Sequence, residues 1–244
     1  MTAYPMILRI IVTAVCAGAL IGCEADVSDR PESVAEFPAP DRAIPENGVS
    51  EADPFPDEDA REERGEAQAI IDLANITPGM TVADIGAGEG YYTVRLGSQV
   101  GAGGRVLAQD IDSEALARLG QRVERERLEN TFIKLGEVDD PRLPTDSFDR
   151  IFLVHVYSEV TEPYAFMWRM WPALAQGGQI IVVEYDRATH AGGIPPTLLF
   201  CEMEAIGYKL VEFVERPDLS SYFSRFERGE ARVEPDQIKV CLNG

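Results

Sequence analysis

Four residues near position 85 have the types and the spacing of a ligand-binding turn. The stretch VADIGAGEGYYT, residues 82–93, is an apolar run that ends on Asp84 and then places Gly86, Gly88 and Gly90 at alternate positions. Glycines let the backbone turn tightly and let a ligand lie against it without an intervening Cβ. Ligands of doubly wound α/β sheets bind outside the carboxyl ends of the strands, so a strand ending near Asp84 would present this turn to a ligand.

The spacing and charge of the turn indicate a cationic ligand. A dinucleotide turn reads G-x-G-x-x-G, whereas this one reads G-x-G-x-G, and a nicotinamide-dependent oxidoreductase is therefore a disfavoured alternative. Asp84 and Glu89 flank the turn. A carboxylate about 5 Å from a unit charge contributes roughly 3 kcal/mol at an effective dielectric constant of 20, and less if Glu89 points to solvent. This sign repels a pyrophosphate and attracts a molecule that carries sulfonium and ammonium groups.

Helical and strand patterns alternate along the chain around the turn. This alternation predicts right-handed crossovers and an α/β fold with a doubly wound, mostly parallel seven-stranded sheet. The last two strands have no helix between them and should pair as an antiparallel edge. The expected strands are 80–86, 105–111, 131–138, 148–156, 177–186, 208–215 and 221–229, and the expected helices are 57–76, 91–100, 113–128, 163–175 and 197–207.

Residues 66–229 resemble a class I S-adenosylmethionine-dependent methyltransferase, in the style of the quinone-biosynthesis and small-molecule branch. The resemblance lies in DIGAGEG (84–90), VLAQDID (106–112), LGEVDDPRLPTDSFD (135–149) and ALAQGGQIIVVEYD (173–186), which occur in the family's order. It implies a Rossmann-like fold with S-adenosylmethionine as cofactor. The site residues that it implies are Asp84, Gly86, Gly88 and Gly90 at the methionine end, Asp110 on the ribose hydroxyls, Ile111 against the adenine, and Glu137 and Val138 at the adenine edge, with Asp139 or Asp140 as alternatives to Glu137.

The candidate catalytic residues follow the fourth expected strand, in LVHVYSEV (153–160). Methyl transfer is an in-line displacement, so holding the acceptor close and aligned supplies most of the acceleration, and a base helps only where the acceptor must lose a proton. His155 and Tyr157 are the predicted catalytic residues, with Ser158 and Glu159 beside them and Tyr185 and Asp186 as second candidates. A structural role for His155 is the alternative.

The first residues indicate export. MTAYPMILRIIVTAVCAGALIGC has one cation, then an apolar core that suits a signal peptide and is short for a transmembrane helix, and ends in LIGC, which resembles the bacterial lipoprotein box. The resemblance implies a signal peptide at 1–22, lipidation of Cys23, and anchoring at the periplasmic side of a membrane or at the cell surface. An uncleaved anchor is the alternative. Residues 23–60 are acidic and proline-rich and predict a disordered tether, with an ordered extension packed on the domain as the alternative. The methyltransferase domain should then span 61–230 and a tail 231–244.

Composition restricts the partners. The formal net charge of −20 makes nucleic acid an unexpected partner, because binding its phosphates relies on Lys and Arg. No metal-ligand spacing is present, and we expect a monomer. In an oxidising compartment Cys201 and Cys241 could pair, or one could be buried and the other free. Two functions stay open at this point: methyl transfer to a small-molecule or lipid-like acceptor, and a non-catalytic adenosyl-binding lipoprotein of the same fold, because HVYSE (155–159) departs from the family's pattern.

Overall fold

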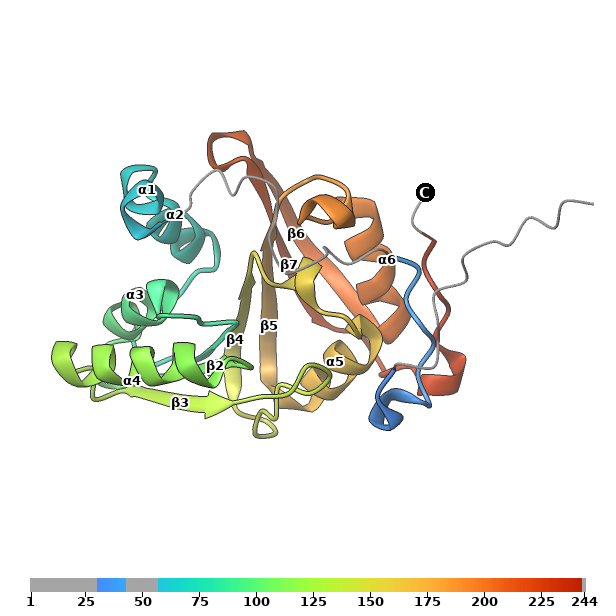
Figure 1. Cartoon of the computed structure of the whole chain (residues 1–244), viewed down its shortest axis with the longest axis horizontal. Helices are drawn as coiled ribbons and strands as arrows, with labels where there is room; N and C mark the ends of the chain where they lie inside the picture. Colours follow the sequence, from blue (N-terminus) through green and yellow to red (C-terminus); the bar gives the residue numbers. More distant parts are fainter. Residues whose placement is uncertain (1–29, 43–56, 243–244) are drawn as a thin grey trace, which may run out of the picture.

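A seven-stranded mixed sheet forms the centre of the molecule (Figure 1). The computed structural model describes residues 30–42 and 57–242. The strand order is β3-β2-β1-β4-β5-β7-β6, in which β7 runs antiparallel to both of its neighbours and the other pairs from β3 to β5 are parallel. The predicted fold and its antiparallel C-terminal pair are confirmed. The strands are β1 (Thr81–Ile85), β2 (Arg105–Asp110), β3 (Thr131–Leu135), β4 (Phe148–Val154), β5 (Leu174–Glu184), β6 (Tyr208–Arg216) and β7 (Ser221–Arg228).

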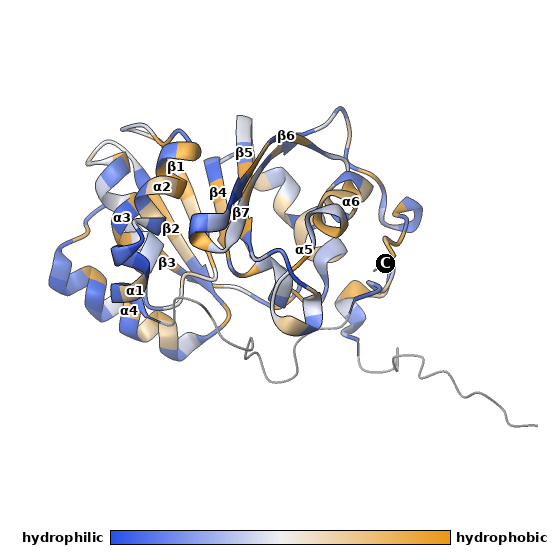
Figure 2. Cartoon of the chain, turned by 90° about the horizontal axis from the view of Figure 1, so that it is seen from above, coloured by the Kyte–Doolittle hydropathy of each residue, from blue (hydrophilic) through white to orange (hydrophobic). Residues whose placement is uncertain are grey.

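Helices cover both faces of this sheet. The first four helices lie on one side of the sheet, and the last two lie on the other side (Figure 1). In the view from above, hydrophobic colouring runs along the strands and hydrophilic colouring along much of α4 (Figure 2). The helices are α1 (Glu58–Glu63), α2 (Glu66–Leu73), α3 (Tyr91–Val100), α4 (Ser113–Glu126), α5 (Pro163–Met170) and α6 (Pro196–Ile206).

Strand β1 is placed so that its end meets the ends of two other strands. Ala83 lies opposite Leu107 of β2 on one side and opposite Ile151 of β4 on the other, both in parallel register. Because all three strands run the same way, their carboxyl ends lie at one edge of the sheet. The order changes direction at β1, with β2 and β3 on one side and β4 on the other, which is where ligands of such sheets bind.

The first expected helix, 57–76, is two helices in the structure. Gly65 has a φ of 63°, in the left-handed region, and separates α1 from α2. The Asp57 carboxylate caps α1 by accepting a hydrogen bond from the Ala60 backbone N–H. In α4 the N-cap is Asp112, whose carboxylate accepts a hydrogen bond from the Glu114 backbone N–H. The apolar spacing over 57–76 predicted one continuous helix, but the left-handed conformation of Gly65 interrupts it.

Residues 30–42, which we call the N-terminal strap, pack on the domain instead of belonging to a disordered tether. Val34 and Phe37 are buried, and the Arg30 guanidinium contacts both carboxylate oxygens of Glu162 at 2.7 and 2.5 Å. The prediction for 23–60 is therefore corrected for 30–42, and residues 57–60 belong to the cap and first turn of α1. The acidic, proline-rich composition gave no sign that Val34 and Phe37 would be buried against residues far away in the sequence.

The C-terminal tail also packs on the domain. Ile238 and Cys241 are buried, and Cys241 forms a disulfide with Cys201 of α6, which settles the alternative left open above. No helix within the described residues is long and apolar enough to cross a membrane. The expected signal peptide (1–22), Cys23, and residues 24–29, 43–56 and 243–244 lie outside the described residues.

Candidate functional site

The glycine turn lies between the end of β1 and the start of α3. Gly86 has a φ of 67°, and a Cβ built on it would lie 2.3 Å from Val156 Cγ2, so any side chain here would collide with the segment after β4. Gly88 also has a positive φ, 53°, but a Cβ there would meet nothing within 4 Å. The first glycine therefore lets two segments approach closely, and the second leaves open space that a ligand can fill.

Asp84 lies beneath this turn rather than on its surface. Its carboxylate is buried and accepts a hydrogen bond of 2.5 Å from the Thr93 hydroxyl of α3. Burial raises the pKa of Asp84 to about 6, against the favourable Thr93 bond and the nearby Arg61 charge. Because this carboxyl group is only partly ionised near pH 6, a cation brought close to it shifts its ionisation strongly.

Asp110 ends β2 and is held in place by the backbone. One of its carboxylate oxygens accepts a hydrogen bond from Gly88 N–H at 2.8 Å, and the other accepts one from Asp112 N–H at 2.9 Å. Each oxygen keeps a further lone pair for a ligand donor. The structure thus joins the glycine turn directly to the acid that the resemblance places on the ribose hydroxyls.

A cavity of about 200 Å³ opens beside Asp110. Of the predicted site residues, it brings together those expected around the nucleoside: Gly86, Asp110, Ile111, Glu137 and Val138. Ile111 is 54% exposed and Val138 is 45% exposed, so both offer apolar surface to a flat ring. The remaining lining residues are Ile85, Gln109, Val156, Glu159, Val160, Thr161 and Phe166.

A second, more open hollow lies on the other side of the turn and includes Arg61 of α1 with Gly86 and Gly88. The Arg61 guanidinium lies 4.1 Å from the ring centre of Tyr91 and forms an ion pair of 2.5 Å with Glu66. Glu89, which we expected to add negative charge to the turn, points outward and pairs with Arg118 at 2.7 Å. The buried carboxylate of Asp84 therefore supplies the negative charge beneath the turn, and Arg61 supplies a positive one nearby.

His155 follows β4 in a strained backbone conformation. Its φ is 56°, its N–H donates to the Val183 carbonyl, and its ring stacks on Tyr185 with 4.1 Å between ring centres. Its Nε2 lies 3.9 Å from a carboxylate oxygen of Glu66, a buried residue of α2. A left-handed non-glycine residue costs on the order of 1 kcal/mol or more, and such strain concentrates at functional sites.

Tyr157 is not placed for the catalytic role that we predicted. Its side chain is fully buried, and its hydroxyl donates a hydrogen bond of 2.8 Å to Glu202 of α6. Neither Tyr157 nor His155 is among the residues that line the cavity, although Glu159 and Val160 of the following loop are; unlike His155, Tyr157 points into the core. The chain forms a 3-10 turn at 157–159 that directs Tyr157 into the core, a change of direction that strand periodicity could not predict.

Two acidic residues, Glu184 and Glu159, have raised pKa values. Burial raises the pKa of Glu184, at the end of β5, to about 7, although Ser158 donates to it through both its N–H and its hydroxyl. Loss of hydration raises the pKa of Glu159, and the charge of Asp110 adds to this effect. The sequence identified Glu159 by its place after β4, but Glu184 read only as one more residue of an apolar strand.

Comparison with known proteins identifies the family. A model described as "Methyltransferase domain" matches residues 76–204, more than half of the chain. The chain belongs to the class I S-adenosylmethionine-dependent methyltransferases. Its cofactor is S-adenosylmethionine, and the open side of Gly88 and the carboxylate of Asp110 fit such a ligand.

Several relatives of this methyltransferase are named as quinone-biosynthesis enzymes. It is 29% identical over 70% of its length to the ubiquinone/menaquinone biosynthesis C-methyltransferase UbiE of Methylococcus capsulatus, covering 67% of that protein. The UbiE of Hydrogenovibrio crunogenus is 32% identical over 49% of the chain, which spans 47% of that relative. The chain thus spans between about half and two thirds of these two relatives.

Solved structures show the same fold at low identity. A methyltransferase from Aquifex aeolicus superposes with a TM-score of 0.64 at 21% identity, covering 68% of this chain and 92% of the other. The [4+2]-cyclase SpnF superposes with a TM-score of 0.61 at 12% identity, covering 78% of this chain and 89% of the other.

Among residues 30–42 and 57–242, no group of three or more His, Cys, Asp or Glu is placed to hold a metal ion.

Proposed function

We propose that this methyltransferase methylates an apolar, small-molecule or lipid-like acceptor, and that an electron-rich ring of the quinol type is the acceptor class. The observation that carries the proposal is the part of the cavity lining that the adenosyl group would leave to the acceptor. Asp110 and Glu137 would face the adenosyl group, the remaining charged lining residue is the acid Glu159, and no Lys or Arg appears among the described residues that line the cavity. Such a wall disfavours phosphorylated or carboxylated acceptors.

The far wall of the cavity supports an apolar acceptor. Val156, Val160 and Phe166 lie there, on the loop after β4 and on α5. The names of the UbiE relatives point to the same acceptor class. Arg61, beside the glycine turn, is the cation suited to the carboxylate of the methionine end, while Asp84 favours its ammonium group.

S-adenosylmethionine supplies a methyl group on a positively charged sulfur. His155 is the proposed base, because it directly follows β4 and has a left-handed backbone conformation with a φ of 56°, a kind of strain that concentrates at functional sites. The imidazole would accept the proton that the acceptor loses when it is methylated. Glu66, 3.9 Å from Nε2, stabilises the resulting imidazolium.

The test is methyl transfer from isotopically labelled S-adenosylmethionine to a short-chain demethylated quinol, compared with a phosphorylated hydrophilic acceptor. We expect labelled product from the quinol and none from the anion. His155→Asn, chosen because Asn tolerates the left-handed conformation, should lower kcat at least tenfold and leave the Kd for S-adenosylhomocysteine unchanged. Equal turnover in this variant would return His155 to a structural role, and labelling of the anion alone would overturn the acceptor class.

We further propose that the domain is exported and held on a membrane by a lipid on Cys23. The proposal rests on the sequence of the first 23 residues, which lie outside the described part of the chain. Cys23→Ser should move the protein from the membrane fraction to the soluble fraction. A variant that still sediments with membranes would favour the uncleaved anchor.

A further inference from the structure

The N-terminal strap contacts both loops that form the cavity. On one side, the Ser33 hydroxyl donates a hydrogen bond of 2.5 Å to Asp139, the neighbour of the cavity residue Val138. On the other side, Arg30 forms a two-point ion pair with Glu162, which follows the cavity residue Thr161. The strap therefore bridges the loop after β3 and the loop after β4, which are separated by more than twenty residues in the sequence.

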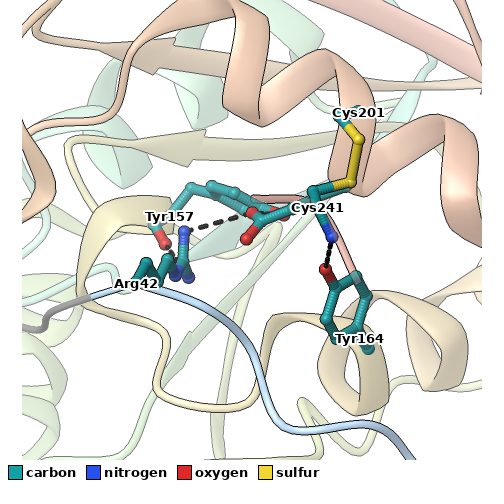
Figure 3. The surroundings of a disulfide bond; sticks show 6 residues. Arg42, Tyr157, Tyr164, Cys201 and Cys241 are labelled. Carbon is teal, nitrogen blue, oxygen red and sulfur yellow. Dashed lines mark hydrogen bonds and ion pairs between the residues drawn. A yellow bond between two sulfur atoms is a disulfide. The ribbon is translucent and has the colours of Figure 1, made fainter. Parts of the chain in front are cut away.

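Arg42, at the end of the strap, is the most deeply placed of these contacts. Its side chain is 0% exposed. One terminal nitrogen donates to the backbone carbonyls of Tyr157 and Val160 at 3.1 and 2.5 Å, and the other lies 3.2 Å from a carboxylate oxygen of Glu202. Figure 3 shows the Arg42 side chain extending from the strap to Tyr157, in the surroundings of the disulfide between Cys201 and Cys241.

The loop that Arg42 holds forms part of the cavity wall. Val160, whose carbonyl accepts from Arg42, lines the cavity, as do Val156, Glu159 and Thr161 on the same loop. Buried carbonyl groups need donors, and a guanidinium is the side chain that can satisfy two carbonyls and a carboxylate at once. We propose that Arg42 is a positioning residue for the 156–161 loop, so that the strap, which does not itself line the adenosyl-binding cavity, fixes one of its walls.

The other charges around Arg42 agree with this role. Glu202 also accepts the Tyr157 hydroxyl, so one carboxylate fixes both the arginine and the first residue of the 3-10 turn. Asp41 pairs through its backbone with Leu242, next to Cys241. The disulfide-linked tail thus contacts the strap at Asp41, and the strap contacts the 156–161 loop through Arg42.

The experiment combines two readouts on the purified full chain, at a temperature where circular dichroism shows every variant folded. The first is hydrogen–deuterium exchange of peptides covering 156–162 without ligand. The second is the Kd for S-adenosylhomocysteine by titration calorimetry. The variants are Arg42→Met, which removes the charge, and Arg42→Lys, which keeps a charge opposite Glu202 but cannot span both carbonyls. The control is Arg232→Met, because Arg232 also contacts a carbonyl and a ring, those of Trp168, but does not reach the cavity loops.

We expect faster exchange in 156–162 and a roughly tenfold higher Kd for both Arg42 variants, with neither change in the Arg232 variant. If Arg42→Met fails to fold, Arg42→Lys decides the question. Wild-type exchange in 156–162 in the Arg42→Lys variant, or faster exchange with an unchanged Kd, would overturn the proposal. The ligand readout rests on the proposed cofactor site, whereas the exchange readout does not. A wild-type chain that binds no adenosyl ligand would therefore refute the site, and exchange alone would then decide the role of Arg42.

Discussion

Replacing Asp84 with asparagine should make the protein more stable and its cofactor binding weaker. Burial raises the pKa of Asp84 from 3.8 to about 6, so ionisation costs the folded state about 3 kcal/mol. The sign follows from the raised pKa: the protonated form is favoured in the folded protein, and stability falls as pH rises from about 4 to about 6. The Asp84→Asn variant would avoid this cost at neutral pH, and the Thr93 hydroxyl would still have an oxygen to donate to.

Binding should depend on pH in the opposite sense. A cationic ligand favours ionised Asp84, so affinity should rise with pH through about 6. Between pH 5 and pH 7 the ionised fraction rises by about tenfold, equivalent to 1.4 kcal/mol, while the α-amino group of the ligand stays protonated. Asp84→Asn should remove this tenfold slope.

The assay is titration calorimetry with S-adenosylmethionine at pH 5, 6 and 7, together with chemical denaturation at the same pH values. The matched control is Asp72→Asn, because Asp72 is exposed on α2 and bonded to Gln68. The control should keep the wild-type slope. A wild-type Kd that does not change with pH, or a slope that survives in Asp84→Asn, would refute the reasoning.

Three further predictions concern neighbouring features. Burial raises the pKa of Glu184 to about 7, so the free energy of unfolding of the wild type should fall as pH rises from about 4.5 to 7, and Glu184→Gln should reduce this fall. The measurement is chemical denaturation at pH 5 and pH 8. An equal change in the free energy of unfolding in the wild type and the variant would contradict the reasoning. Removing both Cys201 and Cys241 should lower the free energy of unfolding by roughly 4 kcal/mol for a sequence separation of 40, and an unchanged denaturation midpoint would contradict this. Gly88→Val should raise the Kd for S-adenosylhomocysteine more than tenfold, whereas Gly101→Val, at a similar φ of 65° with equally open space, should not.

The local features of the fold could be predicted from the sequence. The glycine turn and the acid that ends β2 are encoded by neighbouring residues, and each strand and helix of the alternation is encoded by its own apolar spacing. The structure brings Asp110, Ile111, Glu137 and Val138 around one cavity, as the motif order implied. Their contact with the cofactor stays a prediction.

Features that depend on distant contacts could not be predicted in the same way. The strap reads as a charged, proline-rich coil, and its order depends on Glu162 and Glu202, which lie 132 and 160 residues away from their arginine partners. The direction of Tyr157 depends on the same Glu202. The composition of a segment indicates whether it can fold by itself. It contains no information about distant residues such as Glu162 and Glu202, which order the strap and Tyr157.

The most direct test of the account is a crystal structure of the protein with S-adenosylhomocysteine. We expect the adenine between Ile111 and Val138, the ribose hydroxyls on Asp110, and the amino-acid end along Gly86 and Gly88 toward Arg61. Adenosyl density at another place on the molecule, with this turn and cavity filled only by solvent, would contradict the assignment of the site.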